Sequence, residues 1–343
     1  MSGGDTEPLP APPEPARKPR PSTSAVWRSG RVRMGVALAA LVALVVSTAL
    51  AFGGPTPTIP SARIHLGGKP VAVAVGENAV WVTGPDGKLW KIAPAKGKAT
   101  QHRSVGKLRP SAVAVGGGAV WVVGPGSPWV WRFTPAPFKA QERIRVGGPP
   151  FGVAASPDAV WVTLPDKHQL VRIDPKSKHV VKKIRITGLT PRAVAVSGTA
   201  VWVADPGVAV AQIDAKKNRV VKVIPLKGAK PEKGAKVLAC SLAVDEGAVW
   251  VANPDGSVTR IDPSKDRVLG SIPIGGTLGG IAVAAGSVWV TTTSSSSVLR
   301  IDPKTNRVTA TAPGGSGAAC VGLNKQNVWV ADTGDGTVTR LGS

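Results

Sequence analysis

Five aspartates occur at matching places in a segment that recurs along the chain, each two to four residues after a Val-Trp-Val tripeptide: Asp86, Asp166, Asp205, Asp255 and Asp332. Carboxylates that converge on one mouth of a fold could hold a divalent cation such as calcium. Asp in Pro-Asp-Gly-like sequences also forms its own turn by accepting a backbone hydrogen bond. Both interpretations stay open, and no cofactor other than this possible divalent cation is predicted.

Four lysines and one tryptophan are the candidate contacts for a partner. Residues 226–238 interrupt the regular repeat, and loops that depart from a scaffold often carry binding residues. Trp129 lies outside the regular tryptophan pattern, next to a predicted loop. The lysines of the interruption are Lys227, Lys230, Lys233 and Lys236.

The elements that position these residues follow from the repeat. The segment AVWVTGPDG recurs in seven variants, and their tryptophans lie 40, 40, 41, 48, 39 and 40 residues apart: Trp81, Trp121, Trp161, Trp202, Trp250, Trp289 and Trp329. The tryptophans could form a stacking platform for bases or sugars, but identical placement in every copy favours packing between sheets. The 41 glycines and 32 prolines of the chain indicate many turns between short strands.

Each unit predicts four short strands, and four strands in about 40 residues are typical of a propeller blade. We therefore expect an all-β, seven-bladed β-propeller over residues 61–343. The last unit contains only three strands, whereas residues 61–68 resemble a fourth strand. We expect this N-terminal strand to complete the last blade and so to close the ring.

The two cysteines, Cys240 and Cys320, begin the predicted inner strands of the fifth and seventh blades. Cysteines in an exported domain often form a disulfide, but bridging needs Cα atoms within about 7 Å. One blade separates the two positions, and the interruption before Cys240 could supply the extra reach. The sequence leaves open whether they are bonded.

The N-terminal region predicts a membrane anchor. Residues 1–33 are rich in Pro and Arg and predict a disordered tail. Residues 34–52 form an uncharged run long enough to cross a bilayer, and residues 53–60 form a Pro-rich linker. The basic residues before the run place the tail in the cytoplasm and the propeller outside the cell membrane. The alternative is a secreted protein, cleaved near Ala51 at an Ala-x-Ala site.

The charge distribution predicts partners only by class. The net charge is +23, and the basic excess falls on the predicted outer strands of the blades. Anionic lipids or anionic cell-surface polymers fit this pattern, although such charge also serves solubility. An unknown protein or small ligand is the other expected partner; nucleic acid is not expected, and the chain is expected to be monomeric.

The units, with VAVAVGENAVWV followed by a segment such as VLRIDPKTNRV, resemble the extracytoplasmic YVTN-type and virginiamycin B lyase-like propellers, although Trp stands where the YVTN pattern has Tyr. The resemblance implies a propeller and, for the lyases, metal-assisted chemistry by His and acidic residues on one face. Of His65, His102, His168 and His179, we expect only His168 at that face, so no catalytic residue is predicted. We expect a non-enzymatic binding, sensing or scaffold module, with a metal-assisted lyase or hydrolase as the alternative.

Overall fold

The computed structural model describes residue 59 and residues 61–226, 237–245, 247–324 and 326–342. The predicted tail, membrane helix and nearly all of the linker lie outside the described residues, as do Lys227, Lys230, Lys233 and Lys236. Within the described ranges, no helix is both long and apolar enough to span a bilayer.

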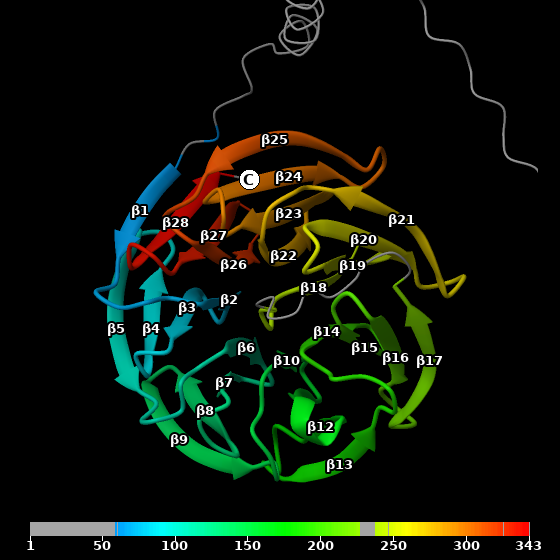
Figure 1. The fold of residues 1–343 in the computed structure, drawn as a ribbon. Coiled ribbons are helices and arrows are strands. Elements are labelled where there is room, and N and C mark those ends of the chain that lie inside the picture. Colours follow the sequence, from blue (N-terminus) through cyan, green and yellow to red (C-terminus); the bar gives the residue numbers. More distant parts are fainter. Residues whose placement is uncertain (1–58, 60, 227–236, 246, 325, 343) are drawn as a thin grey trace, which may run out of the picture. The chain divides into compact units, whose positions relative to one another are not determined.

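The described residues form seven antiparallel sheets of four strands each, arranged as blades around a ring (Figure 1). This confirms the predicted all-β, seven-bladed propeller. Within each blade the first strand lines the centre and the fourth strand forms the outer wall. At one end of the ring, the second strand of each blade joins the third and the chain crosses to the next blade. We call this the top end.

Blades one to three comprise β2 (Ala72–Gly76), β3 (Ala79–Gly84), β4 (Lys88–Ala93), β5 (Lys98–Ser104), β6 (Ala112–Gly116), β7 (Ala119–Val123), β8 (Trp129–Pro135), β9 (Phe138–Arg145), β10 (Val153–Ala155), β11 (Val160–Leu164), β12 (Gln169–Ile173) and β13 (Val180–Arg185). A short 3-10 helix, η1 (Pro165–Lys167), lies in the top loop of blade three.

Blades four to six comprise β14 (Ala193–Ser197), β15 (Ala200–Asp205), β16 (Ala209–Asp214), β17 (Arg219–Pro225), β18 (Leu242–Asp245), β19 (Ala248–Ala252), β20 (Ser257–Asp262), β21 (Arg267–Pro273), β22 (Leu278–Ala284), β23 (Ser287–Thr292), β24 (Ser297–Asp302) and β25 (Arg307–Pro313). Blade seven comprises β26 (Ala318–Leu323), β27 (Asn327–Asp332), β28 (Thr337–Gly342) and β1 (Ser61–His65).

The ring is closed by the strand at the start of the propeller. β1 pairs antiparallel with β28, with Ser61 opposite Leu341 and His65 opposite Thr337 (Figure 1). The predicted fourth strand of the last blade is therefore confirmed. Pairing the two ends of the domain removes the exposed edge that β28 would otherwise present.

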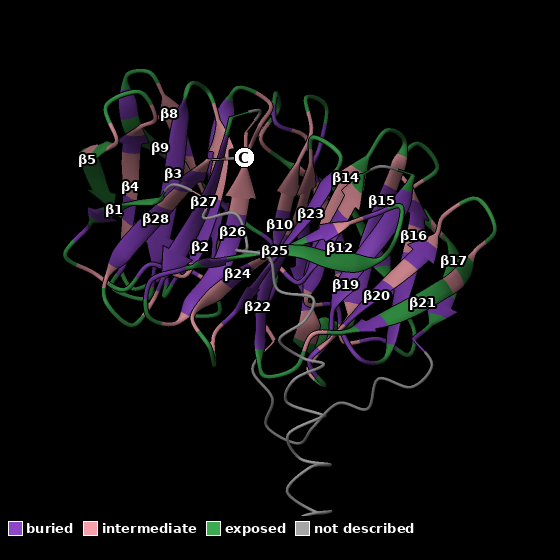
Figure 2. Ribbon diagram, turned by 90° about the horizontal axis from the view of Figure 1, so that it is seen from above, coloured by how far each residue is buried: buried purple, intermediate pink, exposed green. Residues whose placement is uncertain are grey.

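The core lies between neighbouring blades and is built from the second strands. The seven repeat tryptophans are at most 2% exposed, in agreement with a packing role. Exposed residues concentrate in the end loops and along outermost strands such as β5 and β25 (Figure 2). Alternating apolar residues thus bury one large ring in each blade against its neighbour.

A cation covers the buried tryptophan in six of the seven described blades. The Arg260 guanidinium lies 5.1 Å from the ring centre of Trp250, and five other blades repeat the contact. Arg260 also donates a hydrogen bond of 3.0 Å to Asn306 Oδ1 in the next blade. Arg172 does the same to Asn218 Oδ1 at 2.9 Å. In blades one, three, five and seven, the cation over the tryptophan thus also donates a hydrogen bond to the following blade.

Candidate functional site

A cavity of about 580 Å³ opens at the top end of the ring, near its centre. Its lining includes Val71, Ser111, Phe151 and Arg192, which occupy the same place in blades one to four, one residue after the crossover proline. Because these crossovers lead directly into the innermost strands, the cavity lies at the mouth of the central channel. We call it the mouth cavity.

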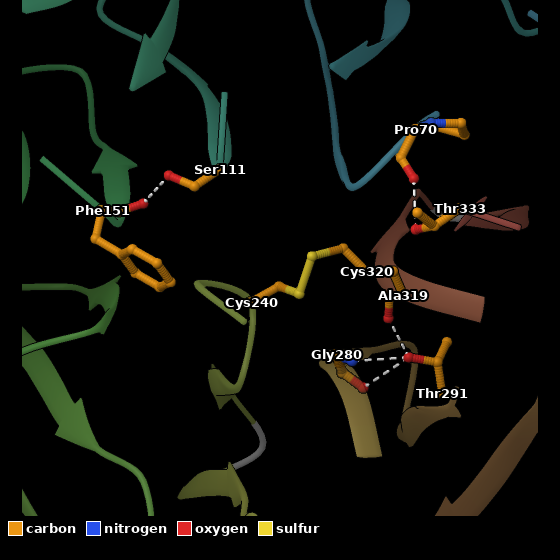
Figure 3. The surroundings of a disulfide bond; sticks show 9 residues. All are labelled: Pro70, Ser111, Phe151, Cys240, Gly280, Thr291, Ala319, Cys320 and Thr333. Atoms are coloured by element: carbon orange, nitrogen blue, oxygen red, sulfur yellow. Dashed lines mark hydrogen bonds between the residues drawn. A yellow bond between two sulfur atoms is a disulfide. The ribbon is translucent and has the colours of Figure 1, made fainter. Parts of the chain in front are cut away.

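Hydrogen bonds between neighbouring blades fix the crossovers that form this mouth. Ser111 Oγ donates to the Phe151 carbonyl at 2.7 Å, and Thr163 Oγ1 donates to the Arg192 carbonyl at 3.1 Å. Where blade seven meets blade one, Thr333 Oγ1 donates to the Pro70 carbonyl at 2.8 Å (Figure 3). The backbone beneath Phe151 and Arg192 is therefore held by side chains of the preceding blade, which preorganises the mouth.

Arg192 and Phe151 form a stacked pair in the lining. The Arg192 guanidinium lies 5.5 Å from the centre of the Phe151 ring. Asp205 lies nearby, where burial raises the pKa of its carboxyl above the ordinary value. The hydrogen bond from the Thr190 N–H, 2.9 Å long, and the charge of Arg192 oppose that rise in pKa. Stacking orients the guanidinium without consuming all its N–H donors, which leaves donors for a ligand.

Arg109 supplies a second cation to the mouth cavity. Its backbone has φ +53°, a left-handed conformation that is uncommon for a residue with a side chain. Within the described residues, no ion pair or hydrogen bond engages its guanidinium, and none of the described lining residues is acidic. Two cations and one aromatic ring, with no carboxylate among the described lining residues, make this cavity suited to an anion.

A disulfide joins Cys240 to Cys320 beside the mouth, with a Cα–Cα distance of 5.8 Å (Figure 3). Cys240 precedes β18 instead of lying within it, and its carbonyl accepts a 2.9 Å hydrogen bond from the Ile281 N–H of blade six. The bond crosses blade six at Gly280, where an added Cβ would lie 2.8 Å from Cys240 Sγ. A side chain at position 280 would obstruct the bridge, so glycine allows two blades that are not neighbours to be joined.

The predicted aspartates divide into three kinds of environment. Asp86 and Asp166 are exposed, and Asp255 accepts hydrogen bonds from Ser257 in its own turn. Asp205 and Asp332 instead accept from crossovers, Asp332 from the Gly315 N–H at 2.9 Å. Within the part of the chain that the structure describes, no three residues among His, Cys, Asp and Glu gather to hold a metal ion.

His168 and Trp129 lie near the top end, as expected. His168 follows η1, and its Nδ1 lies 2.7 Å from the Leu189 carbonyl of the crossover to blade four. Trp129 is half-buried at the start of β8, with the Arg143 guanidinium 5.4 Å from its ring centre. Neither side chain lines the mouth cavity.

Arg109, Arg192 and Phe151 are not among the residues predicted from the sequence. The available signal was the alignment of the crossovers, where Arg192 and Phe151 replace the Val and Ser that follow the proline in blades one and two. Of residues 226–238, the last two described positions, Val237 and Leu238, line the cavity. The interruption therefore ends at the mouth cavity.

No protein-family model matches the chain, and no curated protein matches it in sequence. Similar solved structures include virginiamycin B lyase from Staphylococcus aureus, at 16% identity and TM-score 0.71, over 83% of this chain and 99% of that one. A catalytically inactive variant of that lyase with quinupristin matches at 15% identity and TM-score 0.69, over 83% and 99%. Kuenenia stuttgartiensis hydrazine synthase matches at 17% identity and TM-score 0.69, over 80% and 96%.

These similarities show the fold alone. The neighbours include virginiamycin B lyase, one of the two kinds of propeller that the repeat units resemble, so the resemblance agrees with the architecture. A virginiamycin B lyase and a hydrazine synthase both match this fold, and function on such folds resides in individual sites.

Proposed function

We propose that this protein is a binding module whose propeller is displayed outside the cytoplasm and takes a small anionic ligand in the mouth cavity. The observation that carries the proposal is the pair of arginines, Arg109 and Arg192, in a lining with no described acidic residue. The planar guanidinium group can donate two parallel hydrogen bonds to two oxygens of a carboxylate or a phosphate.

The rest of the lining indicates the remaining part of the ligand. Phe151, Val71 and several prolines provide apolar contacts, and the Phe151 ring is already oriented by Arg192. A ligand with a flat apolar group and one carboxylate would use both kinds of contact. Such cavities, apolar with a few placed polar groups, are the usual form of small-molecule sites.

Benzoate is a suitable probe, with benzamide as its uncharged counterpart. We expect calorimetric titration of the full-length chain to detect benzoate and not benzamide. Each guanidinium–carboxylate bond is worth about 1.5–3 kcal/mol, so replacing both arginines by Arg109→Gln and Arg192→Gln should weaken benzoate at least about tenfold. The matched control is Arg219→Gln with Arg267→Gln, which removes the same charge from the outer wall.

Equal losses in the two double variants would show that the effect is one of net charge and would defeat the anion site. Failure of both probes and of inorganic phosphate would defeat the proposal as a whole. Repeating the titration with magnesium or calcium present tests the metal-assisted lyase or hydrolase alternative, which requires metal-dependent binding or turnover.

Display outside the cytoplasm rests on residues 34–52 and on the basic residues that precede them. An epitope after Ser343 should be removed by protease added to intact cells, while residues 1–33 stay protected. A mature protein that begins near Phe52 would instead support the secreted alternative. Retention of the epitope in intact cells and its cleavage only after lysis would contradict both.

A further inference from the structure

Basic side chains are concentrated on the outer walls of two neighbouring blades. The outermost strands of blades two and three, β9 and β13, carry six exposed basic residues: Lys139, Arg143, Arg145, Lys182, Lys183 and Arg185. The other outermost strands carry fewer: two each on β5 and β17 (Lys98, Arg103, Arg219 and Lys222) and one each on β1, β21 and β25 (Arg63, Arg267 and Arg307). We call the six residues on β9 and β13 the basic wall. With three each, β9 and β13 carry more basic residues than any of the other five outermost strands, and they belong to neighbouring blades.

Among the described residues, no acidic side chain forms an ion pair with the basic wall. Glu142, the acidic residue of β9, is paired with Lys178 at 2.5 Å and so is already engaged outside the wall. None of the ion pairs found among the described residues involves a member of the basic wall. Unpaired like charges on the outer strands of neighbouring blades repel one another, and an anionic partner would relieve that repulsion.

The surface between the two strands is shaped as a groove. An open groove of about 730 Å³ runs between β9 and the segment that enters β13, lined by residues 142–145 and 177–180. In its lining, Arg143 lies 5.4 Å from the ring centre of Trp129 and 5.5 Å from that of Trp131. The two rings hold this arginine in place, which lowers the conformational entropy lost on binding.

The spacing of the charges indicates the shape of the partner. Residues two apart on a strand, such as Arg143 and Arg145 or Lys183 and Arg185, project on the same side about 6.6 Å apart. They form a strip along two strands. A flexible chain that carries one negative group after another can contact several of these cations at once, whereas a flat bilayer would meet a broad face of the molecule.

We propose that the basic wall binds a linear phosphate-bearing polymer. This inference is independent of the mouth cavity, because none of the six residues lines that cavity. It assigns the expected anionic cell-surface partner to blades two and three.

The test uses the full-length chain in a neutral detergent, with inorganic polyphosphate as the probe. The wall variant carries Arg145→Gln, Lys183→Gln and Arg185→Gln. The control variant carries Arg219→Gln, Arg267→Gln and Arg307→Gln, three exposed residues at the starts of β17, β21 and β25. Both lose three charges and keep the N-terminal region, so they differ only in where the charge is lost.

We expect the wall variant to bind polyphosphate at least about tenfold more weakly than the parent at about 150 mM salt, and the control less than about twofold more weakly. The slope of log affinity against log salt should fall by about 2 in the wall variant, at about 0.7 for each lost phosphate contact. Unchanged circular dichroism and urea midpoints would show that both variants are folded.

Equal loss in the two variants, or no loss in either, would overturn the proposal. So would wall-dependent binding to phosphatidylglycerol vesicles without binding to polyphosphate, since the wall would then be a membrane contact. Loss of benzoate binding in the mouth variants leaves this result unaffected, so the two proposals can fail separately.

Discussion

Removing the disulfide should lower the stability of the propeller by an amount that its position sets. Cys240 and Cys320 are 80 residues apart in sequence, so the bond closes a long loop in the unfolded chain. In the chain-entropy treatment, a loop of that length corresponds to about 4.5 kcal/mol at 25 °C. With a urea dependence of about 3 kcal/mol/M, the unfolding midpoint should fall by about 1.5 M.

The assay compares the parent, the parent with reductant, and the Cys240→Ala, Cys320→Ala double variant. Reductant should lower the midpoint of the parent and leave that of the double variant unchanged. Gly280→Ala provides a second perturbation, since its Cβ would lie 2.8 Å from Cys240 Sγ and 3.0 Å from Cys320 Cα. We expect overpacking of about 1–3 kcal/mol in the parent and a smaller cost in the double variant, where the sulfur is gone. A midpoint that stays within about 0.3 M of the parent after verified loss of the bond would refute the reasoning.

Two further predictions concern buried side chains. Trp250→Ala should lower the free energy of unfolding by about 3–5 kcal/mol, because the ring is fully buried and covered by Arg260. Trp129→Ala, at a half-buried surface position, should lower it by less than about 1.5 kcal/mol. Urea unfolding compares the two variants, and equal losses would contradict the packing role. Burial raises the pKa of Asp332 from 3.8 to about 6, against hydrogen bonds from Thr339, Gly315 and Thr337 that lower it. The folded state therefore holds the Asp332 proton more tightly than the unfolded state. The protonated carboxyl stabilises the folded state by on the order of 3 kcal/mol below the unfolded pKa, and this stabilisation is lost as the pH rises through about 6. Unfolding free energies measured from about pH 4 to about pH 7 should show this fall in the parent and not in Asp332→Asn; the same fall in both would rule out Asp332 as its source.

The architecture could be predicted because it depends on features that repeat in the sequence. Seven Val-Trp-Val segments at nearly constant spacing mark the second strand of each blade, and SARIH at residues 61–65 matches the missing fourth strand. These signals are local and sevenfold redundant. Tertiary contacts would have to override all seven at once to produce another fold.

The candidate site could not be predicted because it depends on differences between the repeats. Phe151 and Arg192 are single departures from a repeated crossover, and only the ring brings them to one cavity with Arg109. Asp205 and Asp332, two residues after Val-Trp-Val, bond to a crossover, whereas Asp86, four residues after it, is exposed. The disulfide likewise depended on a neighbour, Gly280, that the spacing of the cysteines does not reveal.

The disulfide and the mouth cavity are linked through the backbone next to Cys240. Val237, Leu238 and Ala239 line the cavity and immediately precede that cysteine, so the bond to Cys320 fixes one end of this lining segment. Without the disulfide, residues 237–239 should adopt more conformations, and a ligand would then have to order them on binding. We therefore expect the Cys240→Ala, Cys320→Ala variant to bind benzoate a few-fold more weakly without urea, where it is still folded. Unchanged affinity in that variant would show that the crossover hydrogen bonds alone, such as Ser111 to Phe151, shape the mouth.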